Sequence, residues 1–269
     1  MATSRLLQQL RCGLAFPFGP IHLALLIGVG SGTAFAALVV EHALEGEFDP
    51  IDTVVFAGLE PWRTERPAAL FAAATHLGDT FVLLAVVAAG VGFLSLIRRR
   101  ANAMMLAAVY AGGTLSVTVL KRVFALARPN ETLHLVVADG GSFPSGHASL
   151  SLLGYGLVAY LATARSPWRV RLIYLVGAVM LALVIGLSRL ILGVHWLSDV
   201  LAGYALAGMW LAAASLLPRF CACVASSVAT GRSIPPAPSN TVRTQKLRPR
   251  RQRRREHPTH TRCPLRRSS

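Results

Sequence analysis

Six apolar stretches, each about as long as a membrane-spanning helix, constrain the fold of this 269-residue chain more than any other feature. They cover approximately Ile21–Val40, Ala68–Ile97, Ala101–Phe124, His147–Ala164, Leu172–Leu190 and His195–Leu217. A helix needs about 20 mainly apolar residues to cross the hydrocarbon core of a bilayer. The spacing therefore predicts an all-α fold, a six-helix transmembrane bundle over residues 21–217.

The composition favours a membrane protein over a soluble one. The chain is 54% hydrophobic and only 14% charged, with a mean hydropathy of +0.53, which is too apolar for an ordinary soluble domain. Polar residues at Thr75–Asp79 predict that the first turns of the second stretch lie among lipid headgroups. Asp49 and Pro50 predict the start of a short interfacial helix over Ile51–Leu59, because Pro is tolerated at the first helical position.

Basic residues in the connections predict the orientation of the bundle. Arg98–Arg100 fill the second connection, and Arg165, Arg169 and Arg171 fill the fourth. Since Lys and Arg concentrate in cytoplasmic connections, we expect the N-terminal segment, residues 1–20, and the C-terminus in the cytoplasm. The first, third and fifth connections then lie outside. The Ala- and Arg-rich composition favours a bacterial cytoplasmic membrane.

The last segment, residues 218–269, carries most of the net charge. From Arg219 onward it contains thirteen Lys or Arg and one acidic residue, Glu256, and so accounts for 12 of the 15 net positive charges. This composition predicts a disordered cytoplasmic tail. The tail either binds anionic leaflet lipids, at about 1 kcal/mol per charge near the surface, or is a solvated extension. Because the charge is confined to the tail, we expect no nucleic-acid partner, and the sequence indicates no oligomeric state.

Ionisable residues gather in the third and fifth connections. Each costs roughly 2.5–3.5 kcal/mol at membrane depth, so a cluster of them indicates a function. Lys121 and Arg128 are seven positions apart and share one helix face if the third helix extends that far, although Pro129 disfavours helix at Arg128. Ser145 and Gly146 precede a new helix, whose free N–H groups form an anion site. The pattern favours phosphate as the anion.

His195 and Asp199 are four positions apart at the predicted start of the sixth helix. At this spacing the carboxylate reaches one imidazole nitrogen and leaves the other free. Arg189, six residues before His195, offers the same anion a planar, two-pronged contact that Lys does not. His147 supplies a second imidazole at the opposite wall of the predicted anion site. The sequence therefore predicts His195 as a base or nucleophile.

Taken together, these residues form three motifs that resemble the signature of the type 2 phosphatidic acid phosphatase superfamily. The motifs are, in chain order, Lys121-x6-Arg128-Pro129, Pro144-Ser145-Gly146-His147 and Ser188-Arg189-x5-His195-x3-Asp199. No signature position departs from the family pattern. The resemblance covers roughly residues 20–217 and excludes the tail. Each motif alone is weak, and their shared order makes the resemblance specific.

The resemblance implies a role for each matching residue. His195 attacks phosphorus and forms a phosphohistidine, Asp199 orients it, and His147 protonates the leaving oxygen and later activates water. The phosphate oxygens are held by Lys121, Arg128, Ser145, Gly146 and Arg189. The family works without a metal, and we expect no cofactor here, since the carboxylates form no cluster for Mg²⁺ beside the two histidines. The implied active site lies at the extracytoplasmic face.

The implied activity is hydrolysis of a membrane lipid phosphate or diphosphate, of the phosphatidate, phosphatidylglycerophosphate or polyprenyl (undecaprenyl) diphosphate type. Two alternatives remain open. The same pocket also suits a phosphotransferase or a phosphatase of soluble phosphate esters, and a non-enzymatic lipid or anion transporter would bind phosphate without cleaving it. Transporters place ionisable residues near the membrane midplane, whereas these lie at helix ends, which favours an enzyme. We interpret His76 and Asp79 as interfacial or helix-packing residues.

Overall fold

The computed structural model describes residues 20–45 and 50–229, and within these ranges it is helical, without a strand. The long helices are α2 (Pro20–Glu45), α3 (Pro50–Gly58), α4 (Glu65–Thr75), α5 (Thr80–Leu96), α6 (Arg100–Phe124), α7 (Gly146–Ala162), α8 (Trp168–Ile191) and α9 (Leu197–Ala229). The short 3₁₀ helices are η1 (Glu60–Arg63), η2 (His76–Gly78) and η3 (Glu131–Leu133). The predicted all-α fold is confirmed for these residues, and α3 confirms the predicted short helix.

The chain divides into two units, Met1–Ser226 and Ser227–Ser269. The helical bundle belongs to the first. Helix α9 continues to Ala229, past Leu217, where the sequence predicts that the last span ends. The predicted N-terminal segment lies almost wholly outside the described residues, and so does the basic tail beyond Ala229.

Within the described ranges, the helices that are long and apolar enough to cross a membrane lie in α2, α6, α8 and α9, and the bent pair of α4–η2 and α5 adds a fifth if counted as one span. Helix α7, the fourth predicted span, is 17 residues long. These helices make the chain a multi-pass membrane protein, while the predicted count of six spans stays a prediction.

The second predicted span is not one helix. The prediction of a single helix over Ala68–Ile97 is wrong, because α4 ends at Thr75 and α5 begins at Thr80, with a bend of 45° between the two helices. The backbone of Asp79 is extended, with φ −65° and ψ 146°, so the helical hydrogen-bond ladder stops there. The break turns the polar side chains of this segment toward α7 and α8.

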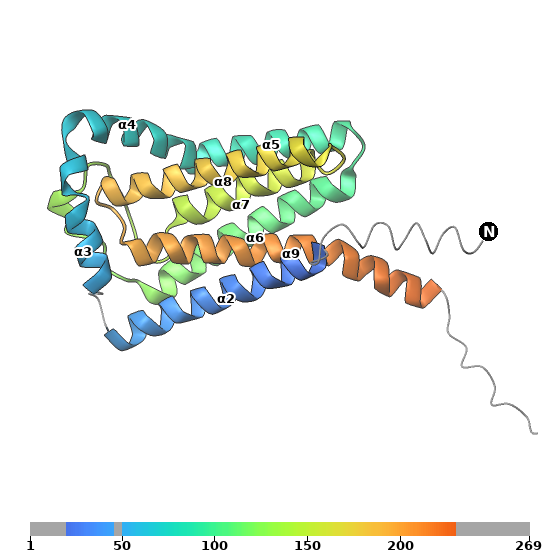
Figure 1. The fold of residues 1–269 in the computed structure, drawn as a ribbon, viewed down its shortest axis with the longest axis horizontal. Coiled ribbons are helices and arrows are strands. Elements are labelled where there is room, and N and C mark those ends of the chain that lie inside the picture. Colours follow the sequence, from blue (N-terminus) through green and yellow to red (C-terminus); the bar gives the residue numbers. More distant parts are fainter. Residues whose placement is uncertain (1–19, 46–49, 230–269) are drawn as a thin grey trace, which may run out of the picture. The chain divides into compact units, whose positions relative to one another are not determined.

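Helices α5 to α9 run along a common axis, and α3 lies across one end of that bundle (Figure 1). At this end α6 and α8 finish and α7 and α9 begin. The side chain of Asp52 on α3 accepts hydrogen bonds from the backbone N–H of Ser198, at 2.9 Å, and from its hydroxyl. Phe56 packs on Trp196, with ring centroids 5.3 Å apart. Helix α3 is therefore anchored to the start of α9.

The core lies between α5, α6, α7 and α9, where Leu83, Leu106, Leu153 and Leu157 are fully buried. Many large apolar side chains on the outer faces are instead exposed, as in the case of Phe81 at 86%. In water such a surface would be an aggregation hazard, but hydrocarbon is as apolar as the side chains. The burial pattern therefore agrees with a bilayer as the surrounding medium.

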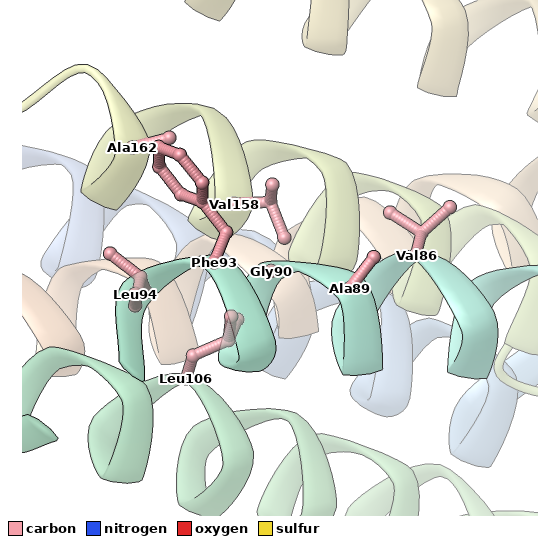
Figure 2. Close-up of a pocket in the computed structure, with 8 residues that line it drawn as sticks. All are labelled: Val86, Ala89, Gly90, Phe93, Leu94, Leu106, Val158 and Ala162. Carbon is pink, nitrogen blue, oxygen red and sulfur yellow. The ribbon is translucent and has the colours of Figure 1, made fainter. Parts of the chain in front are cut away.

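A pocket of about 330 Å³ lies between α5, α6 and α7 (Figure 2). It is lined by Val86, Ala89, Gly90, Phe93, Leu94, Leu106, Val158 and Ala162. None of these side chains carries a polar atom, so this pocket offers no group for acid, base or nucleophilic chemistry. The polar residues predicted to act together lie at the bundle end that α3 crosses.

Candidate active site

His195 and Asp199 form a buried pair, with side chains only 2% and 1% exposed. His195 Nδ1 lies 3.2 Å from Asp199 Oδ2. The same oxygen accepts the backbone N–H of Trp196, at 2.9 Å, and the hydroxyl of Ser142. A buried carboxylate needs such donors because it has lost its water. His195 precedes α9, which begins at Leu197, so it lies in the connection and only Asp199 belongs to the first helical turn.

The third and fifth connections meet at Gly193. This glycine has φ +75°, and a Cβ there would lie 2.7 Å from the carbonyl oxygen of Leu133. Only glycine suits both the left-handed backbone and the close approach. The backbone N–H of Leu135 donates to the carbonyl of Leu192, at 3.0 Å. These contacts bring the loop before His195 against the loop that follows α6.

Arg128 bridges the same two connections. Its Nε and Nη2 donate to the carbonyls of Gly140 and Asp139, at 3.1 and 2.9 Å, and its Nη1 donates to the carbonyl of Val194 at 2.7 Å. Nη1 also lies 3.3 Å from Nε2 of His195. With Nδ1–H donating to the carboxylate, Nε2 keeps its free electron pair. The nitrogen available for reaction therefore faces a guanidinium.

Lys121 reaches the same region from the last turn of α6. Helix α6 ends at Phe124, as the sequence predicts, and Ala125 is left-handed with φ 45°. The helix therefore does not extend to Arg128, and the condition for a shared helix face with Lys121 is not met. The chain reverses there, because the left-handed residue ends the helix. Lys121 Nζ donates to the carbonyls of Gly141 and Ser142, at 2.5 and 3.3 Å.

The start of α7 is packed closely against α9. The backbone N–H of Ser145 donates to the carbonyl of Asp199, at 2.9 Å, and a Cβ at Gly203 would lie 2.7 Å from the carbonyl oxygen of Ser145. A Cβ at Gly146 would lie 3.9 Å from Cε of Lys121. The helix start with its free N–H groups thus lies beside a cation.

Three buried donors near this helix start have no hydrogen-bond partner within the described part of the chain: Ser145 Oγ, Ser149 Oγ and Arg189 Nε. The buried acceptor Oδ1 of Asp199 also has none. Arg189 uses Nη1 to donate to the hydroxyl of Thr75, at 3.0 Å. Buried polar groups without a partner are rare and call for an explanation. A bound anion would satisfy the donors of Ser145 and Arg189, and the guanidinium of Arg189 suits a phosphate oxygen.

His147 forms a second His–Asp pair. Its Nε2 lies 3.1 Å from Oδ1 of Asp79, and the other carboxylate oxygen of Asp79 lies 2.8 Å from Nδ1 of His76. The interpretation of Asp79 as only an interfacial or packing residue missed this contact. A polar residue interrupting an apolar stretch was the signal in the sequence. Ser142, the donor to Asp199, carried no such signal, because serine is common in loops.

The site is strongly basic. Lys121 interacts electrostatically with the cations Arg128 and Arg189 and with the buried carboxylate of Asp199. Burial lowers the pKa of His195 to about 3, and the Asp199 carboxylate opposes this shift only in part. A neutral imidazole is the form that acts as nucleophile. Among residues 20–45 and 50–229 there is no group of three or more His, Cys, Asp or Glu that could hold a metal, and independence from metal stays a prediction.

Comparison with known proteins identifies relatives of the chain. Phosphatidylglycerophosphatase B of Bacillus subtilis (strain 168) is 29% identical over 175 residues, which is 64% of this chain and 83% of the relative. A crystal structure of a transmembrane PAP2-type phosphatidylglycerolphosphate phosphatase from Bacillus subtilis has a similar fold, with a TM-score of 0.66 at 23% identity over 72% of this chain and 97% of that one. LpxE of Aquifex aeolicus has a TM-score of 0.50 at 24% identity, over 64% and 98% of the two chains.

A family match covers residues 101–222 and is described as the PAP2 superfamily. This range contains all three motifs, and with them every residue for which the resemblance implied a role. The resemblance inferred from the motifs is thereby confirmed for residues 101–222. Over these residues the chain is similar to the PAP2 superfamily.

Proposed function

We propose that this protein is an integral-membrane phosphatase that removes a terminal phosphate from a lipid, with His195 as nucleophile. The single observation that carries the proposal is the orientation of the His195 ring. One ring nitrogen is held by Asp199, and the other faces the guanidinium of Arg128. A nucleophile aimed at a cation is suited to attack on an anionic phosphate, because the cation draws the phosphate to the attacking atom.

The reaction would take place in two steps that share the same residues. First, Nε2 of His195 forms a bond to phosphorus while the ester P–O bond breaks, and His147 gives a proton to the leaving oxygen. His147 then takes a proton from water, the water oxygen bonds to phosphorus, and the P–N bond breaks. Inorganic phosphate leaves, and both histidines return to their starting forms.

Charge neutralisation would come from the chain itself. Lys121, Arg128 and Arg189 supply three positive charges around the phosphate, and Ser145 Oγ and the backbone N–H of Gly146 supply neutral donors. Preorganised donors stabilise the charge on the equatorial oxygens without reorganisation during the reaction. We therefore propose that no metal ion takes part in phosphate transfer.

The position of the site suits a lipid substrate. The proposed residues lie at one end of a bundle whose flanks are apolar, so a headgroup can enter while its acyl or prenyl chains stay in hydrocarbon. We propose that this end faces the outside of the cytoplasmic membrane, as the basic connections at the other end predict. The names of the relatives favour phosphatidylglycerophosphate as substrate, ahead of phosphatidate and undecaprenyl diphosphate.

The test is phosphate release by the purified protein from a panel of lipid and soluble phosphates, with His195→Ala as control. We expect release from a lipid phosphate, and loss by a factor on the order of 10⁴ or more in the variant. Acid-labile phosphate should be trapped on the wild type and absent from the variant. Equal release by both proteins would exclude His195 as nucleophile. A product that forms only with an added alcohol acceptor would indicate a transferase.

A further inference from the structure

The contact between Asp79 and His147 joins residues 68 positions apart. We propose that Asp79 is the positioning residue for His147, so that the general acid and the nucleophile each have their own carboxylate. This inference rests on the proposed function. It adds a residue that lies outside the three motifs and outside residues 101–222, which match the family.

The segment Thr75–Asp79 is held against the site by several contacts. A Cβ at Gly78 would lie 2.9 Å from Cδ2 of His147 and 2.6 Å from Cγ2 of Ile185, so only glycine allows this approach. The hydroxyl of Tyr155 on α7 donates to the carbonyl of Leu77, at 2.8 Å. Together with the bond from Arg189 to Thr75 at 3.0 Å, these contacts fix the segment to both α7 and α8. Asp79 is thus held at a defined place beside the imidazole.

The contact also selects which nitrogen of His147 reacts. Because Asp79 accepts the proton on Nε2, Nδ1 is the nitrogen left for the leaving oxygen and later for water. A carboxylate in this position holds the ring orientation and stabilises the imidazolium that donates the proton. Asp79 does not touch the substrate in this arrangement and acts through His147. Its side chain is 41% exposed and that of His147 is 24% exposed, so water has access to the pair.

Two substrates with different leaving groups test this role. The leaving oxygen of an alkyl phosphate such as phosphatidylglycerophosphate needs a proton. The leaving group of p-nitrophenyl phosphate is p-nitrophenolate, which is stable as an anion and needs none. For Asp79→Asn we expect hydrolysis of the lipid to fall by about 10- to 100-fold. With p-nitrophenyl phosphate the first step should remain fast while the activation of water slows. The variant should then release a burst of about one p-nitrophenolate per enzyme and accumulate acid-labile phosphate.

A double-variant cycle tests whether Asp79 acts through His147. If it does, Asp79→Asn combined with His147→Ala should be no slower than His147→Ala alone, because effects of residues that act as a unit are not additive. The matched control is Glu65→Gln on α4, which removes one exposed acidic charge near the same bundle end. We expect Glu65→Gln to hydrolyse both substrates at the rate of the wild type and not to show the burst of p-nitrophenolate expected for Asp79→Asn. Thermal unfolding of each variant checks that the bundle is intact.

Three results would overturn the inference: an Asp79→Asn enzyme with unchanged activity, equal losses on both substrates without a burst, or a double variant slower than His147→Ala alone. Equal losses would indicate a structural role for Asp79. Failure of the proposed function looks different, because the wild type itself would then release phosphate from neither substrate. An active wild type with any of the three results would contradict only the role of Asp79.

Discussion

The two His–Asp pairs of the site differ in burial and in the separation of their residues along the sequence. His195 and Asp199 are four residues apart and almost fully buried, whereas His147 and Asp79 are 68 residues apart and partly exposed. A nucleophile benefits from the absence of water, because water competes for phosphorus. A group that must deliver water needs access to it. The site therefore contains a buried imidazole–carboxylate pair, His195 and Asp199, and an exposed pair, His147 and Asp79.

The carboxylate of the buried pair needs more hydrogen-bond donors than that of the exposed pair. Oδ2 of Asp199 accepts hydrogen bonds from Ser142 and from the backbone of Trp196, besides its contact with His195. Asp79 contacts two histidines and is otherwise open to solvent. Desolvating a carboxylate is costly unless donors replace the lost water. Variants of the buried pair should consequently show larger effects than variants of the exposed pair.

The largest effect that separates the pairs is expected for Asp199→Asn. An amide in place of the carboxylate no longer selects the His195 tautomer with a free Nε2, so phosphate release should fall by about 10³- to 10⁴-fold. Steady-state release from the preferred lipid is the measurement. An effect smaller than that of Asp79→Asn would contradict the assignment of the buried pair to the nucleophile.

Ser142→Ala removes one donor from the buried carboxylate and leaves both histidines in place. Because an acceptor left without its partner costs about 1–3 kcal/mol when buried, we expect a lower unfolding temperature in detergent and a loss of activity of about 10-fold. Ser116→Ala is a matched control, since that hydroxyl donates within α6, to the carbonyl of Gly112. An unchanged Ser142→Ala enzyme would show that Asp199 does not need this support.

His76→Ala tests how much the exposed pair, His147 and Asp79, depends on the contact between His76 and Asp79. The side chain of His76 is 71% exposed and contacts Oδ2 of Asp79, whereas His147 contacts Oδ1. Exposed ion pairs are worth about 0–1 kcal/mol, so we expect activity to fall by less than about threefold. A loss as large as that of Asp79→Asn would show that His76 itself takes part in proton transfer.

The buried pair also gives a prediction for how the stability of the protein depends on pH. Because the pKa of His195 is lowered from 6.5 to about 3, the unfolded chain binds a proton between these values that the folded chain does not. The contribution of this residue to stability should therefore fall as the pH decreases from 6.5 toward 3. We expect the unfolding temperature of the wild type to fall more steeply over this window than that of His195→Gln. Parallel curves would contradict the low pKa.

Local features of the sequence were enough to find the three motifs and the family resemblance that they carry. Apolar stretches report helices because hydrocarbon leaves the backbone few alternatives, and residues four apart at a helix start are neighbours by geometry. That is why His195 and Asp199 could be paired without a structure. The same local rules failed where the chain left regular helix. They joined α4 to α5 across Asp79.

Contacts between distant segments were decided only by the tertiary structure. Ser142 meets Asp199 across 57 positions, and Asp79 meets His147 across 68. The packing of Gly78 against α8 brings the second pair together, and the seating of Gly193 on the η3 loop places His195 beside Arg128. Such contacts depend on the angles and separations at which helices pack, and these are properties of several segments at once. The local spacing of residues therefore determines that Asp199 pairs with His195, whereas only the tertiary structure determines that Asp79 pairs with His147.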